Sequence, residues 1–393
     1  MTSRPPAAIR RINAVGRALP QPSLDPRRLM ATASKRTGLS DFGDLAFLDG
    51  LQVLTRSLED EARLTFLGRV AARKHLASLL EVRLRLMAAR SDGESVPAPL
   101  VVLGLPRTGT TVLYGMLATN PSLRSPSTWE VARPFPAPTG SDPKRERLCN
   151  KDFEGFRRLV PDIDQIHPMA AHLPQECLAL HAPSFSSYEF VSNFPVPSYW
   201  AWLREQDMTP AYRFELQFLK HLQSGGLRGD HWVLKTPAHL LWLDALLEVF
   251  PDAMLVHTHR DPTTVLASVS SLIYTVRSAM SYGVDPAQVG QEQLDTWSSG
   301  MRRVMEVRDG LAEGRVLDIR YEDTIASPVE TIERIYSHFG LPYDETVEQG
   351  ARGYLAANPR DKHGTHTYTL ADFGLRQEEV QAAFADYNAR FTA

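Results

Sequence analysis

Hydrophobic residues recur at helical spacing between residues 42 and 90. Leu51, Leu54 and Leu58 are three or four positions apart with polar residues between them, and leucines and valines continue this spacing beyond them. Apolar positions at this spacing form one face of an amphipathic helix. The pattern predicts two or three helices that form a helical lead-in to the main domain. Residues 1–40, rich in Pro, Arg, Ser and Ala, are expected to be irregular.

From residue 98 onward, short apolar runs alternate with helical segments. The runs predict a buried strand at 100–103 and further strands at 232–235, 254–259 and 316–320. Each run is followed by a segment of helical character, at 112–118, 240–250, 262–277 and 328–339. Such alternation is typical of an α/β fold in which helices flank a parallel sheet. We therefore expect an N-terminal arm and helical segment over 1–95 and an α/β domain over 96–393, with a helical, aromatic-rich substrate insert at about 135–228.

The composition narrows the class of protein. The chain has 393 residues, 43 Lys and Arg against 46 Asp and Glu, and a formal net charge of -3. A chain so close to neutrality is a poor candidate for a nucleic-acid-binding protein. Its two cysteines, Cys149 and Cys177, exclude a disulfide framework and a cysteine-based metal site, and they fit a cytoplasmic location. No apolar run approaches the roughly 20 residues of a membrane-spanning helix, so no transmembrane segment is expected.

The most informative segment follows the first predicted strand. It is Gly104-Leu-Pro-Arg-Thr-Gly-Thr-Thr111, and a helix is expected to begin within it. Exposed backbone N–H groups and the positive end of the helix dipole make such a turn an anion site. Gly109 allows the backbone to approach an anion closely. The side chains that add charge and hydrogen bonds are Arg107, Thr108, Thr110 and Thr111.

The two glycines of this loop have the G-x4-G spacing of a P-loop. The lysine that follows the second glycine of a P-loop is replaced by Thr110. That lysine normally neutralises the terminal phosphates of a nucleoside triphosphate. Its replacement argues against ATP hydrolysis, and a P-loop kinase-like nucleotide-binding enzyme is kept as the alternative interpretation.

The sequence Leu-Pro-Arg-Thr-Gly-Thr-Thr resembles the 5′-phosphosulfate loop of sulfotransferases that use 3′-phosphoadenosine 5′-phosphosulfate (PAPS), in the form that bacterial members carry. The resemblance covers roughly residues 98–375. It implies a P-loop-like parallel sheet flanked by helices. It also implies that this loop holds the phosphosulfate and that Arg107 stabilises the leaving phosphate.

Two further segments resemble motifs of the same family. Arg260, in His-Arg-Asp-Pro, and Ser268 eight residues later resemble the motif that binds the 3′-phosphate. Lys235, in Leu-Lys-Thr-Pro, matches a lysine that assists transfer. In cytosolic members a histidine two residues after this lysine takes part, but this chain has Pro237 there. The nearest histidine is His239, for which a catalytic and a structural role both stay open.

Two late segments complete the predicted nucleotide site. Tyr321, in Arg-Tyr-Glu-Asp, resembles the family's tyrosine near the adenine. A basic segment near the C-terminus resembles the family's loop over the 3′-phosphate, and its residues are Arg360, Lys362, His363 and Gly364.

Transfer also requires a group that takes the acceptor's proton. The resemblance points to Glu130, which lies shortly after the first helix as the base glutamate does in some members, and a histidine is the alternative. An in-line displacement needs no metal ion. No tight ligand spacing is present among His167, His172, His181 and Glu176, so no metal site is expected.

Aromatic residues crowd the segment 185–202, where they are expected to pack as core or to line an apolar acceptor pocket. The resemblance as a whole predicts a sulfotransferase that moves a sulfuryl group from PAPS to a hydroxyl or amine by in-line displacement. A small molecule, a lipid or a glycan is the expected acceptor, and a homo-oligomer is compatible with the sequence.

Overall fold

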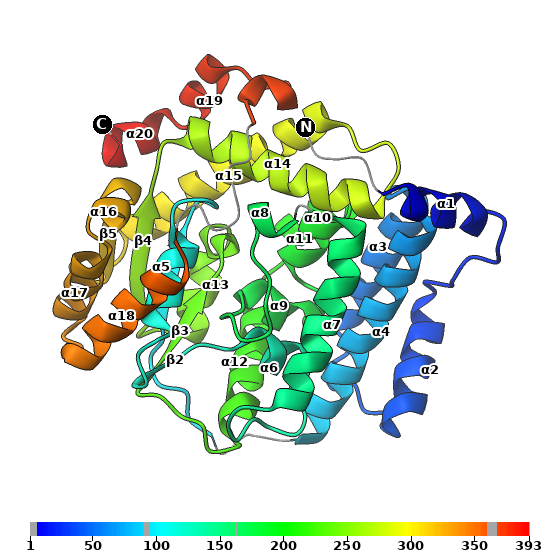
Figure 1. Cartoon of the computed structure of the whole chain (residues 1–393), viewed down its shortest axis with the longest axis horizontal. Coiled ribbons are helices and arrows are strands. Elements are labelled where there is room, and N and C mark those ends of the chain that lie inside the picture. Colours follow the sequence, from blue (N-terminus) through cyan, green and yellow to red (C-terminus); the bar gives the residue numbers. More distant parts are fainter. Residues whose placement is uncertain (1–5, 90–93, 162, 360–367, 393) are drawn as a thin grey trace.

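A computed structural model of the chain describes residues 6–89, 94–161, 163–359 and 368–392. Its centre is a five-stranded parallel sheet with the order β2-β3-β1-β4-β5 (Figure 1). The strands are β1 Leu100–Gly104, β2 Leu123–Arg124, β3 His231–Lys235, β4 Met254–His259 and β5 Val316–Arg320. The predicted α/β class and the four predicted strands are confirmed. The edge strand β2 was not predicted, because two residues carry no readable pattern.

The central strands are buried on both faces, which explains why their sequence is a continuous apolar run. Successive side chains of a strand point to opposite faces of the sheet. Leu100 and Val102 of β1 accordingly join the core cluster on one face, and Val101 and Leu103 join the larger cluster on the other.

Helices cover both faces of the sheet (Figure 1). Those between β1 and β3 are α5 Thr110–Leu117, α6 Thr128–Ala132, α7 Pro143–Leu159, α8 Ile163–Ile166, α9 Cys177–His181, α10 Tyr188–Asn193, α11 Pro197–Arg204 and α12 Thr209–Gln223. Those after β3 are α13 Leu243–Val249, α14 Pro262–Met280, α15 Pro286–Asp309, α16 Tyr321–Ala326, α17 Pro328–Phe339, α18 Glu345–Ala357, α19 Gln377–Ala383 and α20 Ala385–Phe391. Among the described residues, every helix is too short or too polar to cross a bilayer.

The N-terminal part is helical throughout, with α1 Ala7–Gly16, α2 Pro26–Thr37, α3 Phe47–Asp60 and α4 Phe66–Ala89. Of the two or three helices predicted between residues 42 and 90, the structure has two, α3 and α4. The expectation that residues 1–40 are irregular is wrong. Because the segment is rich in Pro, Arg, Ser and Ala, three local signals of a helix were overlooked in its sequence.

These three signals mark where α2 begins and ends. The Asp25 carboxylate accepts a hydrogen bond from the Arg28 backbone N–H at 2.9 Å, and Pro26 occupies the first turn. Gly38, at φ 72, ends the helix in the left-handed conformation. Leu29 and Ala33 are buried and belong to the main core cluster, so α2 is part of the packed molecule.

The carboxyl ends of the strands lie at one edge of the sheet. The loop at 104–109, the start of α14 and the start of α16 all follow these ends. The short 3-10 turn η2 (Pro237–Leu240) follows β3 in the same way. Ligands of open α/β sheets bind at this edge, and most of the predicted site residues lie there.

Candidate active site

The loop between β1 and α5 is shaped by three residues with positive φ. Gly104 has φ 151, Arg107 has φ 69 and Gly109 has φ 82. A Cβ on Gly104 would lie 2.2 Å from Thr258 Oγ1, so only glycine fits there. The turn brings the first N–H groups of α5 to the carboxyl edge, where the helix dipole favours an anion.

The three threonines of this loop have different surroundings. Thr108 is buried, and its hydroxyl lies 2.6 Å from both the Leu105 carbonyl and Thr258 Oγ1. It therefore anchors the loop to β4 and points away from the edge. Thr110 is buried at the start of α5, whereas Thr111 is exposed one residue later.

Arg107, Arg260, Ser268 and Tyr321 meet beside the loop, although they come from four segments of the chain. Arg107 Nε donates to Ser268 Oγ at 3.1 Å. Arg260 donates to the Arg107 carbonyl at 2.7 Å, and its guanidinium lies 3.8 Å from the centre of the Tyr321 ring. The Tyr321 ring in turn lies against Gly109. Two guanidinium groups and a helix start together form a strongly cationic surface that suits a doubly anionic ligand.

Lys235 forms the second part of the site. Its side chain is 3% exposed, and its Nζ lies 2.5 Å from Glu176 Oε1. The other Glu176 oxygen accepts from the Thr236 hydroxyl at 3.4 Å. Burial by itself would raise the pKa of Glu176, but the charges of Lys235 and His167 outweigh it and lower that pKa. Glu176 is thus ionised near neutral pH and can accept a proton.

His167 lies between these two groups of residues. Its neighbour Ile166 accepts a hydrogen bond from Arg107 NH1 at 3.0 Å, which ties the end of α8 to the anion loop. The side chain of His167 is accessible, yet the surrounding protein desolvates the ring and lowers its pKa. Glu176 raises this pKa, whereas Lys235 and Arg107 lower it further. The three charged groups are therefore close enough to act on one ring.

Sequence reasoning did not assign Glu176 to catalysis. The residue lies 59 positions before Lys235 in the helical insert, at the N-cap of α9. A proline and a polar residue before a short apolar helix indicate a helix start, but nothing in the sequence pairs this carboxylate with a strand-end lysine. The contact exists only because the insert folds back over the carboxyl edge.

Glu130 has a different environment. It is buried in α6, and its Oε2 accepts from the Ser127 backbone N–H at 2.8 Å to complete a capping box. Its Oε1 accepts from Arg124 at 3.1 Å. Both carboxylate oxygens are engaged in holding α6 and the β2 region together. These contacts favour a structural role for Glu130 over the base role expected from the resemblance.

His239 is fully buried in the turn η2 below Lys235. Its Nδ1 lies 2.8 Å from the Tyr212 hydroxyl, and its Nε2 has no partner among the described residues. Burial lowers its pKa well below the usual value, and the charges of His181 and Lys235 act in the same direction. His239 is thus a buried, neutral ring in the turn that follows β3, which favours the structural role that the sequence left open.

The remaining predicted residues fall into three groups. Arg360, Lys362, His363 and Gly364 lie outside the described residues. Among the described residues, His167, His172, His181 and Glu176 form no metal-ligand cluster. The aromatic residues of the segment 185–202 pack mainly as core: the buried ones are Phe185, Tyr188, Phe190, Phe194, Tyr199 and Trp200.

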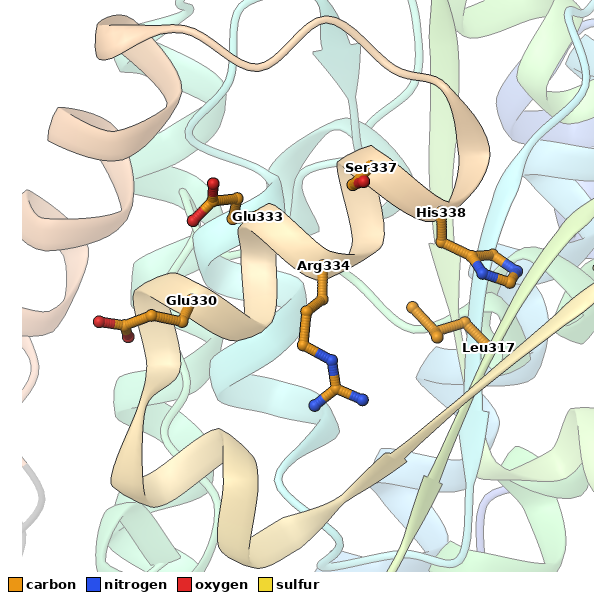
Figure 2. Close-up of a pocket in the computed structure, with 6 residues that line it drawn as sticks. All are labelled: Leu317, Glu330, Glu333, Arg334, Ser337 and His338. Atoms are coloured by element: carbon orange, nitrogen blue, oxygen red, sulfur yellow. The ribbon is translucent and has the colours of Figure 1, made fainter.

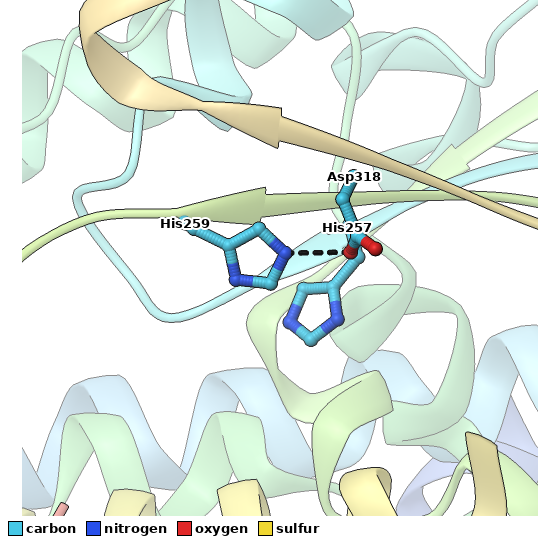
Figure 3. A group of neighbouring side chains, drawn as sticks. All are labelled: His257, His259 and Asp318. Carbon is cyan, nitrogen blue, oxygen red and sulfur yellow. Dashed lines mark hydrogen bonds and ion pairs between the residues drawn. The ribbon is translucent and has the colours of Figure 1, made fainter. Parts of the chain in front are cut away.

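A group that the sequence did not suggest lies at the ends of β4 and β5, where His257, His259 and Asp318 converge (Figure 3). His259 Nε2 lies 2.7 Å from Asp318, but Arg308 also binds both Asp318 oxygens at 2.8 Å. Arg308 further donates to His257 Nδ1 at 2.7 Å. A fixed guanidinium in the middle of the cluster repels a divalent ion, so we assign the cluster to structure.

This cluster also holds the backbone of Arg260. The Tyr387 hydroxyl, in the C-terminal helix α20, lies 3.3 Å from His259 Nδ1 and accepts from the Arg260 backbone N–H at 3.2 Å. Phe391 of the same helix stacks on the His259 ring. The C-terminal helix therefore supports the arginine at the end of β4.

A surface hollow lies elsewhere, on the outer side of β5 and α17 (Figure 2). It contains none of the predicted site residues, and its lining side chains are Leu317, Glu330, Glu333, Arg334, Ser337 and His338. His338 at one end of it binds the carbonyl of Gly314, which precedes β5. The hollow thus extends toward the amino end of the strand, away from the carboxyl edge.

Comparison with known proteins adds an independent finding. Residues 99–345 match the model of the sulfotransferase family. The omega-hydroxy-beta-dihydromenaquinone-9 sulfotransferases Stf3 of Mycobacterium bovis and Mycobacterium tuberculosis are each 27% identical to the chain over 312 residues, which are 75% of this chain and 76% of the relative.

Two solved structures are similar over almost the whole chain. The crystal structure of sulfotransferase STF1 from Mycobacterium tuberculosis H37Rv has a TM-score of 0.80 at 34% identity, covering 92% of this chain and 98% of the other. That of sulfotransferase STF9 from Mycobacterium avium has a TM-score of 0.86 at 27% identity, covering 95% and 98%. The similarity includes the N-terminal helices, because the covered share exceeds the α/β domain alone.

Proposed function

The chain belongs to the sulfotransferase family, and we propose that it transfers a sulfuryl group from PAPS to a hydroxyl group on an apolar, lipid-like acceptor. The proposal rests above all on the meeting of Arg107, Arg260, Ser268 and Tyr321 at the anion loop, with Lys235 and Glu176 beside them. The lipid-like acceptor is supported by the name of the Stf3 relatives, which act on a dihydromenaquinone derivative.

The donor is bound by the cationic surface around the anion loop. The backbone N–H groups at the start of α5, together with Arg107 and Thr111, hold the 5′-phosphosulfate. Arg260 and Ser268 bind the 3′-phosphate, and the Tyr321 ring, against which Arg260 is stacked, packs on the adenine. In the structure Ser268 and Arg107 bind each other, so both polar groups are already oriented toward this place.

In the reaction the acceptor oxygen forms a bond to sulfur while the bond from sulfur to the phosphate oxygen breaks. The electron pair of the broken bond stays on the leaving 3′-phosphoadenosine 5′-phosphate, and the acceptor's proton moves to a base. Charge grows on the leaving phosphate in such an in-line displacement. Arg107 and Lys235 stabilise this charge, which is the larger part of their work in the transition state.

Glu176 is the proposed base. Its ionised carboxylate lies beside Lys235, and in contrast to Glu130 it has a single close partner within the part of the chain that the structure describes. When the donor binds, its negative charge competes with Glu176 for Lys235. Weakening that ion pair raises the proton affinity of the carboxylate at the moment a base is needed. His239 and Thr236 support the strand end that carries Lys235.

Thermal stabilisation separates this function from the kinase-like alternative. A ligand that binds only the folded protein stabilises it by an amount that grows with the logarithm of its concentration over its Kd, and so raises the melting temperature. We expect 3′-phosphoadenosine 5′-phosphate to raise the melting temperature and ATP with magnesium to leave it nearly unchanged. Stabilisation by ATP with magnesium alone would favour the kinase-like enzyme.

The acceptor is tested by incubating the full chain with labelled PAPS and parallel sets of long-chain alcohols, phenols and glycans. We expect labelled sulfate on the long-chain alcohols, with turnover that increases with the apolar length of the acceptor. Transfer to glycans or phenols alone would leave the sulfotransferase assignment intact and refute the lipid-like acceptor.

A further inference from the structure

Helix α1 is fixed to the rest of the protein by one narrow face. Asn13 Oδ1 accepts a hydrogen bond from the Leu67 backbone N–H at 3.0 Å, which satisfies a free donor at the start of α4. Gly16 lies so close to Phe66 that a Cβ would come within 2.2 Å of its ring. The helix is therefore a docked part of the molecule, with Asn13 and Gly16 as its buried residues.

Beside this face α1 presents an apolar stripe to solvent. Ala8, Ile12 and Val15 follow one another at intervals of four and three residues, the spacing of one helix face, and Leu19 lies in the turn just after α1. Ile12 is 45% exposed, Val15 67% and Leu19 48%. Large apolar side chains in a row on a water-facing helix are unusual in a soluble surface and mark an interaction site.

The surroundings of the stripe are cationic, in contrast to the rest of the protein. The first 40 residues contain eight Lys and Arg and one acidic residue, whereas the chain as a whole has a net charge of -3. Residues 41–393 therefore have a net charge of -10. Arg10, Arg11 and Arg17 lie on α1 and just after it, and Asp25 is occupied as the cap of α2. No carboxylate of the described residues forms an ion pair with these three arginines.

The location of α1 relates the stripe to the site. Arg17 lies over the ring of Tyr282, and the Met280 carbonyl at the end of α14 accepts from the Thr65 backbone N–H. The N-terminal end of α14 follows Arg260 directly. Figure 1 shows α14 running from the sheet toward α1. With its 19 residues α14 is about 28 Å long, and it connects the strand end that carries Arg260 to the segment that contacts α1.

We propose that α1 is an interfacial helix that docks the protein on the surface of an anionic lipid bilayer. An interfacial helix inserts its apolar side chains at the level of the lipid headgroups, while arginines of the same segment reach anionic headgroups. The positive charge of α1 favours an anionic bilayer over a second copy of the chain as the binding partner. Two α1 helices would bring their arginines together, whereas an anionic surface neutralises them. The proposal does not depend on the identity of the acceptor.

The test is cosedimentation of the full chain with vesicles of phosphatidylcholine alone and of phosphatidylcholine with phosphatidylglycerol. We expect binding to the anionic vesicles that weakens as salt is added, because salt screens the arginines. The double variant Ile12→Asp/Val15→Asp should lose binding by at least about tenfold, since two apolar side chains can no longer insert. Arg10→Glu/Arg11→Glu should reduce binding to the anionic vesicles by a similar factor.

Leu45→Asp is the matched control. Leu45 is 59% exposed, but the neighbouring Asp44 carbonyl binds Arg83, which places it near the opposite end of α4 from α1. This variant should bind vesicles like the wild-type chain. All variants should keep the melting-temperature increase caused by 3′-phosphoadenosine 5′-phosphate, which reports folding and donor binding.

Three results would overturn the proposal. The first is a wild-type chain that fails to bind anionic vesicles at low salt. The second is vesicle binding by Ile12→Asp/Val15→Asp that equals the wild type. The third is an α1 variant that converts a dimer into a monomer without any effect on vesicle binding, which would assign the stripe to a second copy.

Discussion

The two sides of the site are built in different ways. On the donor side (Arg107, Ser268, Arg260 and Tyr321) every side chain lies within ten residues of a strand's carboxyl end. On the acceptor side (Glu176, Lys235 and His167) only Lys235 lies on a strand, and the other two come from loops of the helical insert. In the proposed function, donor recognition therefore follows from the sheet, and proton acceptance depends on how the insert folds over it.

The charges of the two sides differ as well. The donor side holds Arg107 and Arg260 without a carboxylate partner among the described residues. On the acceptor side Lys235 is neutralised by Glu176 at 2.5 Å. An excess of positive charge binds an anion tightly, whereas a balanced pair can exchange partners and move a proton. The first arrangement suits binding and the second suits chemistry.

The largest expected effect is on the acceptor side. Glu176→Gln preserves the shape of the side chain and removes the base, so kcat should fall by roughly 10²–10⁴-fold. The Kd for 3′-phosphoadenosine 5′-phosphate should change little, as measured by calorimetry. The deficit should shrink for an acceptor with an acidic hydroxyl, such as a nitrophenol, since less proton removal is needed.

Glu130→Gln is the matched comparison for that experiment. It should lower the melting temperature, because the capping box and the contact with Arg124 are weakened, while kcat of the remaining folded protein stays near normal. If instead Glu130→Gln lowers kcat and Glu176→Gln lowers only the melting temperature, Glu130 is the base and the assignment of the acceptor side is wrong.

Lys235→Ala should have the next largest effect. Loss of a group that stabilises charge on the leaving phosphate is expected to reduce kcat by about 10²–10³-fold. Product affinity should change only modestly, because most of the interaction forms in the transition state. Equal losses in product affinity and in kcat would show that Lys235 belongs to the donor side in function.

Arg260→Ala tests the donor side. The loss of a charge-assisted contact should weaken binding of 3′-phosphoadenosine 5′-phosphate by about 1.5–3 kcal/mol. Binding of adenosine 5′-phosphosulfate, which lacks the 3′-phosphate, should weaken far less. Calorimetry with both ligands decides the point, and similar losses for the two would remove Arg260 from the 3′-phosphate site.

The smallest expected effect concerns the stability of the protein. It tests separately the buried histidines that lie under the two sides of the site. Burial lowers the pKa of His239, under the acceptor side, and of His257, under the donor side, well below 6.5. The unfolded chain then binds more protons than the folded one below pH 6.5, so stability falls as the pH drops. Each such histidine contributes a slope of up to about 1.4 kcal/mol per pH unit.

Melting temperatures of the wild type, His239→Asn and His257→Asn between pH 7.5 and about 5 measure these contributions. Each variant should have a lower melting temperature than the wild type at neutral pH. Its melting temperature should then fall less than that of the wild type as the pH is lowered. A variant whose pH dependence matches the wild type would mean that its histidine takes up a proton in the folded protein.

Much of the architecture was readable in the sequence. The runs that became β1, β3 and β4 are largely apolar because both faces of a parallel sheet are covered, whereas the edge strand β5 is only partly buried. The loop from Gly104 to Thr111 was also readable, since glycines at fixed spacing after a strand are needed for its left-handed turns. A backbone conformation that only certain residues can adopt is therefore visible in the sequence at the same positions.

Other features were decided only when distant segments met. Helices α1 and α2 were not predicted because the few residues that cap them are hard to recognise in a segment rich in proline and arginine. Their burial also depends on packing against α4, which the sequence does not show. The sequence pointed to Glu130 as the base and gave no sign of a role for Glu176 in proton transfer. Tertiary contacts alone distinguish them: one binds its own helix start and Arg124, and the other faces Lys235 across 59 residues of chain.

The sequence by itself therefore determined the sheet, the anion loop and the strand-end basic residues, because each is specified by neighbours a few positions away. Tertiary structure decided the partner of Lys235, the burial of His239 and the exposure of the α1 stripe. The physical reason is that a side chain's charge state and accessibility depend on everything packed within several ångströms of it. That neighbourhood is assembled from segments whose separation along the chain carries no information about their distance in space.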